Sequence, residues 1–182
     1  MKLLFFFLLP ICLSAQIKLD SIGVFQKGVA IAKSNNKFGL IKKNQEAIIP
    51  FLYDDIEMLE NGLFVVKKEN KLGIYSKKGK QIVPFIYSFI SPFRENMAAV
   101  QYIDKWGYID NKGNVIIDYL YDFAWDFYKG KAMVELNKKF GLISRQNKVL
   151  LPIIYDELSG FDEQGKARAT LNNNTFYINL KL

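Results

Sequence analysis

Short apolar runs alternate with polar turns along this chain, and the alternation recurs every 34 residues. Each repeat contains three such runs. The first is small and β-branched, as in residues 29–32, the second carries an aromatic or apolar residue followed by glycine, as in Trp106-Gly107, and the third ends in tyrosine, as in residues 47–53. Short runs of this type between Asn-, Lys- and Gly-containing turns are typical of antiparallel hairpins. We therefore predict an all-β protein made of tandem repeats of about 34 residues, each with three short antiparallel strands.

Two residue types keep one position in every repeat, which indicates that they have structural roles. The glycines of the second strand are Gly39, Gly73, Gly107 and Gly141, and the tyrosines that end the third strand are Tyr53, Tyr87, Tyr121 and Tyr155. A constant long period indicates units that bury their apolar faces against their neighbours. Trp106, in front of Gly107, is expected to be buried in the same way. Strand patterns do not determine curvature, so we expect an open solenoid or superhelical meander, with propeller-like closure as the alternative.

The first 15 residues have the features of a secretory signal peptide. Lys2 precedes an apolar run at residues 3–13, and Ser14-Ala15 provides a small-residue exit. The run is shorter than the roughly 20 apolar residues that span a bilayer. We expect residues 1–15 to be removed and the protein to be periplasmic or secreted, with no transmembrane segment afterwards. Cys12 offers an alternative, a lipid-anchored N-terminus, although the residues before it depart from the lipoprotein pattern.

Residues 16–182 are expected to form one repeat domain. We divide it into a partial first unit at 16–37, units near 38–71, 72–105, 106–139 and 140–174, and a C-terminal cap at 175–182. In the cap, Thr175-Phe176 replaces the aromatic-glycine pair. Atypical terminal units are usual in repeat arrays.

The repeats resemble the WG repeat, also called the KWG repeat, of many bacterial proteins. Residues 105–110 read Lys-Trp-Gly-Tyr-Ile-Asp, and the accompanying Pro-x-x-Tyr-Asp element is present at residues 50–54 and 152–156. The resemblance extends over nearly all of residues 16–182. It implies a β-repeat scaffold without a general enzymatic activity, and it supplies no catalytic residue.

Composition disfavours most enzymatic chemistry. The chain has no histidine, and its one cysteine, Cys12, lies in the predicted signal peptide. Serine-histidine catalysis and the usual zinc sites need these residues, and no glycine-rich phosphate loop is present. Aspartates follow the tyrosine position in four repeats, but each repeat offers about one carboxylate where Ca²⁺ needs 6–8 oxygen ligands. We expect no catalytic residue, no metal and no cofactor, and we interpret the aspartates as turn residues.

Lysines give the chain a formal net charge of +7 and a candidate basic stripe. Lys37, Lys71, Lys105 and Lys139 all precede the second strand of a repeat. Lysines aligned along one edge would attract an anionic polymer. The alternative is that they keep hairpin tips hydrated and protect exposed strand edges. We favour the second interpretation because 18 acidic residues are interspersed.

Four aromatic residues occupy positions where the other repeats have polar ones. Phe89 and Phe123 align with Asp55 and Glu157, Trp125 with Glu57, Ser91 and Ser159, and Tyr128 with Gln26, Glu60, Arg94 and Asp162. Positions that accept charged residues are expected to face solvent, and exposed aromatics in one area mark a binding patch. The alternative is that these rings pack against an adjacent loop or a curved inner face.

From these patterns we expect an exported, monomeric, non-enzymatic binding or scaffold module. Its partner would be a protein or an envelope glycan, and no feature points to specific nucleic-acid binding. An alternative function is binding of an anionic or carbohydrate envelope polymer through the lysine-rich turns and the central aromatics. A third, an unrecognised enzyme, is disfavoured by the missing histidine, cysteine and catalytic motifs.

Overall fold

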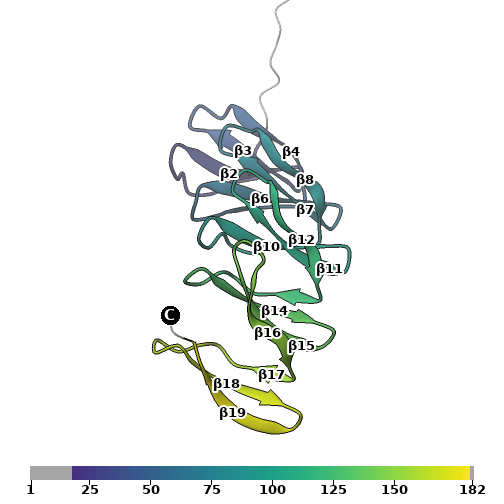
Figure 1. The fold of residues 1–182 in the computed structure, drawn as a ribbon. Coiled ribbons are helices and arrows are strands. Elements are labelled where there is room, and N and C mark those ends of the chain that lie inside the picture. Colours follow the sequence, from purple (N-terminus) through teal and green to yellow (C-terminus); the bar gives the residue numbers. More distant parts are fainter. Residues whose placement is uncertain (1–17, 181–182) are drawn as a thin grey trace, which may run out of the picture.

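The computed structural model describes residues 18–180, which form five small antiparallel sheets (Figure 1). Sheet 1 contains β1 (Ser21–Ile22), β2 (Val29–Ser34), β3 (Lys37–Lys42) and β4 (Ala47–Tyr53). Sheet 2 contains β5 (Asp55–Met58), β6 (Leu63–Lys68), β7 (Lys71–Ser76) and β8 (Gln81–Tyr87). Sheet 3 contains β9 (Phe89–Ile90), β10 (Met97–Tyr102), β11 (Lys105–Asp110) and β12 (Val115–Tyr121). Sheet 4 contains β13 (Phe123–Ala124), β14 (Lys131–Leu136), β15 (Lys139–Ser144) and β16 (Val149–Tyr155). Sheet 5 contains β17 (Glu157–Leu158), β18 (Lys166–Leu171) and β19 (Asn174–Asn179).

The sheets follow one another in chain order, so the prediction of an all-β repeat array is confirmed. Contacts join each sheet to the next, for example β3 and β4 to β5 and β6. Sheet 1 and sheet 5 lie at opposite ends of the described residues, and the stack is open rather than closed into a ring (Figure 1). The predicted signal peptide, residues 1–15 with Cys12, lies outside the described residues.

Each sheet also contains a short strand that the sequence pattern did not predict. The segment after the tyrosine position turns back and pairs with the first long strand of the next repeat, as in Ile56 opposite Val66. In sheets 1, 3, 4 and 5 this strand has only two residues. A segment that short has too little alternation for a pattern to reveal it. The three predicted strands are thus present in each of sheets 1–4, and the short strand is added as a fourth.

The hydrophobic core consists of separate layers between neighbouring sheets. Between sheets 3 and 4 it contains Trp106, Tyr108, Ile117, Tyr121 and Phe127, all buried. The equivalent layers between the other sheets include Tyr53 and Tyr87, also buried, whereas Tyr155 is half-buried. The stack of layers agrees with repeat units that cannot bury their apolar faces alone.

The glycines of the second strand lie where the third strand passes too close for a side chain. A Cβ on Gly39 or Gly73 would lie 2.8 Å from the carbonyl oxygen of Ile49 or Val83, respectively. On Gly107 it would lie 2.5 Å from the carbonyl oxygen of Ile117. The pairing between the second and third strands is irregular at these points, as expected of bulges. Close backbone approach, not ligand approach, therefore accounts for these glycines, and for Gly141 in sheet 4.

Sheet 5 differs because Phe176 occupies the glycine position. Phe176 lies opposite Ala169, as Gly141 lies opposite Val134 in sheet 4. In sheets 1–4 a side chain at this position would clash with the third strand, which passes close to it. Among the described residues sheet 5 has no third long strand, so the phenylalanine fits. This explains the atypical last unit, the predicted cap at 175–182, of which the structure describes residues 175–180.

Candidate functional site

Three of the four predicted patch residues lie together, in a line of rings that crosses from sheet 3 to sheet 4. We call Phe89, Trp106, Phe123 and Trp125 the aromatic row. Ring centroids are 5.2 Å apart for Phe89 and Trp106, 4.6 Å for Trp106 and Phe123, and 4.5 Å for Phe123 and Trp125. Trp106 is buried, while Phe89, Phe123 and Trp125 are 44%, 37% and 36% exposed. The row thus joins the core layer to the surface.

Strand register explains how the row forms. Phe89 pairs with Gln101 and Gln101 with Trp106, so Phe89 and Trp106 lie on one face of sheet 3. Phe123 has the corresponding place in sheet 4, opposite Glu135. The positions of Trp106, Phe123 and Trp125 are all aromatic only between sheets 3 and 4. The junction between sheets 4 and 5 has Phe140, Glu157 and Ser159 at these positions.

Tyr128 does not join the row. It is 68% exposed, and the Lys129 ammonium lies 5.5 Å from the centre of its ring. Trp106 does join the row, although the sequence indicated it only as a core residue. No signal in the sequence distinguished it, because Phe38, Leu72 and Phe140 show its position to be apolar in sheets 1, 2 and 4 as well.

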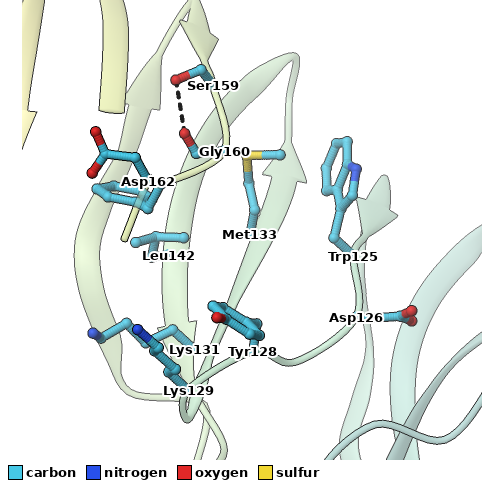
Figure 2. A pocket seen from close by; sticks show the side chains of 11 residues that line it. Trp125, Asp126, Tyr128, Lys129, Lys131, Met133, Leu142, Ser159, Gly160 and Asp162 are labelled. Atoms are coloured by element: carbon cyan, nitrogen blue, oxygen red, sulfur yellow. Dashed lines mark hydrogen bonds between the residues drawn. The ribbon is translucent and has the colours of Figure 1, made fainter. Parts of the chain in front are cut away.

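Trp125 separates two cavities. One, of about 400 Å³, is lined by the four residues of the aromatic row together with Ser91, Pro92, Ala124 and Asp126. The other, of about 240 Å³, lies between sheets 4 and 5, and Trp125 and Tyr128 lie on two sides of it (Figure 2). Its apolar floor includes Met133 and Leu142, and Lys129 and Lys131 lie at one end. Both cavities offer aromatic surface with polar groups beside it.

The lysines of the candidate basic stripe are mostly paired with aspartates. Lys37 Nζ lies 2.6 Å from Asp54 Oδ1, Lys105 Nζ lies 2.5 Å from Asp122 Oδ1, and Lys139 pairs with Asp156. The second oxygen of each aspartate accepts a backbone N–H of the next sheet's hairpin turn, from Glu69, Asn137 or Asn172. We call this arrangement an aspartate latch. The pairing leaves less unpaired positive charge for a polymer than the sequence alone implied.

The latches predict acid sensitivity. The lysine hydrogen bond first, and the backbone N–H second, hold the pKa of Asp54, Asp122 and Asp156 below its ordinary value. A carboxyl whose pKa is lowered by folding stabilises the folded state above its unfolded pKa, and this stability is lost as pH falls through the folded pKa. We expect the melting temperature to drop as pH is lowered from about 5 to about 3. Thermal melts of the wild type and D122N measure this effect, and an equally steep drop in D122N would contradict it.

Two further observations concern the described part of the chain. Within residues 18–180, no group of three or more histidine, cysteine or acidic side chains is arranged to hold a metal ion. No helix long and apolar enough to cross a membrane was found among the same residues.

The fold and the repeated positions define a tandem β-repeat protein. The chain belongs to the WG containing repeat family, whose sequence profile matches residues 14–38, 38–71, 73–106, 106–140 and 140–174. The five consecutive matches confirm the resemblance that residues 105–110 indicated. No curated protein sequence matches the chain.

Several solved structures share part of the architecture. Kluyveromyces lactis Hsv2 is 10% identical, with a TM-score of 0.43, covering 84% of this chain and 57% of its own. PorZ, described as a surface component of the type-IX secretion system of Porphyromonas gingivalis, is 8% identical, with a TM-score of 0.38 and coverages of 90% and 26%. The extracellular domain of BT3049 from B. thetaiotaomicron is also 8% identical, with a TM-score of 0.41 and coverages of 90% and 27%. The chain therefore spans between about a quarter and six tenths of the length of these proteins. Similarities this low say nothing about its function.

Proposed function

We propose that this protein is a non-enzymatic binding module whose binding surface is the aromatic row. One observation supports the proposal above the others. Phe89, Phe123 and Trp125 are partly exposed in one line, at positions where the flanking repeats have Asp55, Glu157 or serine. The other repeats fold with Asp55, Glu157 or serine at these positions, so the fold does not require rings there, and contiguous apolar surface is a feature of interaction sites. Clusters of Phe and Trp are typical of the centre of an interface.

A second candidate function is binding of an envelope glycan. The observation that favours it is Trp125, which is 36% exposed, lines both cavities and has exposed Asp126 beside it. An aromatic face with an adjacent carboxylate suits a sugar ring and its hydroxyls. The lysine-rich turns support this function less, because Lys37, Lys105 and Lys139 already pair with aspartates.

The double variant Phe123→Glu and Trp125→Ser tests the proposed surface. It introduces the residues that other repeats carry at these positions, Glu157 and Ser159. Because both rings are about two-thirds buried, we expect a loss of stability of about 1–3 kcal/mol, larger than for fully exposed residues. The folded variant should lose binding in a panel of envelope glycans and periplasmic protein fractions, measured against the wild type.

Tyr177→Ser is the matched control for this experiment. Tyr177 is an exposed aromatic, 64% accessible, on sheet 5 and outside the row. Its replacement should leave every binding signal unchanged. Equal profiles for the wild type and the folded double variant would reject the aromatic row as the binding surface. If the wild type binds only glycans, and the double variant loses that binding, the second candidate function would be selected.

We also propose that the protein is exported, on the basis of Lys2, the apolar run at residues 3–13 and the small residues Ser14-Ala15. Expression in a Gram-negative host followed by mass spectrometry of the N-terminus tests this. The expected product begins at or near Gln16. An acylated Cys12 would instead mean a lipid anchor, and an intact Met1 would contradict export.

A further inference from the structure

One junction in the array lacks its aspartate latch. Asp54, Asp122 and Asp156 close the junctions between sheets 1 and 2, 3 and 4, and 4 and 5. Between sheets 2 and 3 the corresponding residue is Ser88. The Ser88 hydroxyl lies 3.0 Å from Oε1 and 3.3 Å from the backbone oxygen of Gln101, so it does not replace the missing carboxylate.

The two groups that a latch carboxylate would join are nevertheless present. Leu72 pairs with Tyr87, as Phe38 pairs with Tyr53, and this register places Lys71 beside Ser88 as Lys37 lies beside Asp54. None of the ion pairs in the described residues includes Lys71. Ile103 has the turn position of Glu69 and Asn137, whose backbone N–H groups bind the aspartates. A cationic side chain and a backbone donor thus flank a position that a carboxylate fills at the other junctions.

The surroundings of this position carry additional positive charge. Lys68 pairs directly with Lys71 across the β6–β7 hairpin, and exposed Lys67 is on the same strand as Lys68. Within residues 18–180 neither of them takes part in an ion pair. Two exposed acidic residues lie nearby, Glu69 in the turn between Lys68 and Lys71 and Asp104 next to Ile103, and the three lysines exceed them by one charge. Such a site attracts an anion.

The turn beside Ser88 consists of Ile103 and Asp104, and Ile103 is strained. Ile103 is 65% exposed and has a φ of +55°, where the other hairpins have Asn35, Glu69, Asn137 and Asn172. A β-branched residue with positive φ is unfavourable and persists where the surrounding structure or a function requires it. Tyr102, next to Ile103, is 36% exposed. Ile103 and Tyr102 together offer apolar surface of the kind that contributes to a protein interface.

We propose that Lys71, the Ile103 backbone N–H and Ser88 form a recognition site for an acidic side chain of a protein partner, with Ile103 and Tyr102 contacting an apolar residue next to that acid. The partner's carboxylate occupies the place that Asp54 and Asp122 take at the neighbouring junctions. The Tyr-Asp pairs that end the repeats, as in Tyr121-Asp122, are internal examples of the sequence this site accepts. This inference does not depend on the aromatic row.

The variant Ser88→Asp tests the site by supplying the missing carboxylate from within the chain. We expect it to fold, to melt at a slightly higher temperature, and to slow hydrogen exchange of the Ile103 amide. Unchanged exchange at Ile103 would show that the geometry does not accept a carboxylate and would overturn the proposal.

Selection of a random 12-residue peptide library on the full-length wild-type protein tests recognition. Enriched peptides are expected to carry Asp or Glu beside an apolar residue. Their affinity should fall by about fivefold or more in S88D and in Lys71→Gln, which corresponds to roughly 1 kcal/mol. A matched peptide with Asn or Gln in place of the acid should bind the wild-type protein as weakly as the acidic peptide binds these two variants. Lys71→Gln keeps the test valid if S88D fails to fold.

The aromatic-row variant separates this proposal from the proposed function. Acidic peptides should bind the Phe123→Glu, Trp125→Ser double variant with the same affinity as the wild type, even if that variant has lost its other ligands. Peptides without an acidic residue, or equal binding to the wild type, S88D and Lys71→Gln, would overturn the proposal. An acidic oligosaccharide that binds through Lys71 when no peptide does would overturn the assignment to a protein partner.

Discussion

Gly107→Val is expected to destabilise the protein by about 3 kcal/mol or more, at the upper end of what overpacking costs. A Cβ at this position would lie 2.5 Å from the carbonyl oxygen of Ile117 and 2.9 Å from the backbone carbon and oxygen of Asp118. All of these are backbone atoms of β12, so no side chain can rotate to relieve the clash. The strand must move, and its displacement would disturb Ile117 and Tyr121, which are buried between sheets 3 and 4.

Urea denaturation measures this effect, with Gly160→Val as the matched control. A Cβ on Gly160 would have no atom within 4 Å, and its φ does not lie in the left-handed region. The control should therefore change stability by less than about 1 kcal/mol, as surface substitutions usually do. Equal midpoints for Gly107→Val and the wild type would mean that β11 and β12 do not approach as closely as described.

The sequence predicted the repeat, its period and the long strands because those features depend on positions that recur. Glycine at residues 39, 73, 107 and 141 recurs since the third strand crosses the second in the same way in sheets 1–4. The short strands such as β9 and β13 escaped prediction because two residues contain no period. Their pairing is determined by the stacking of one repeat on the next, which is a tertiary effect.

Comparison between repeats was also the source of the candidate site, and it has a limit. It detects residues that break a repeated type, and in this way it selected Phe89, Phe123, Trp125 and Tyr128. It misses residues whose type is shared, such as Trp106, whose place in the row depends on contacts with the next sheet. It also cannot show that Lys105 reaches Asp122, because the two residues are 17 positions apart and are brought together by the pairing of Trp106 with Tyr121 in sheet 3.

Trp106→Ala is expected to destabilise the protein by about 3–5 kcal/mol, the usual range for truncating a buried aromatic residue. The indole is only 7% exposed, and it contacts both Phe89 and Phe123. Its removal would leave a cavity in the core layer between sheets 3 and 4 and would also take away the support of the exposed rings.

Trp106→Leu is the matched control, since Leu72 fills the same position in sheet 2. We expect the leucine variant to lose less stability than the alanine variant while still failing to hold Phe123 in place. Urea denaturation measures the first effect, and binding to whichever ligand depends on Phe123 measures the second. A loss below about 1 kcal/mol in Trp106→Ala would mean that the ring behaves as a surface residue, and the aromatic row would then have no anchor in the core.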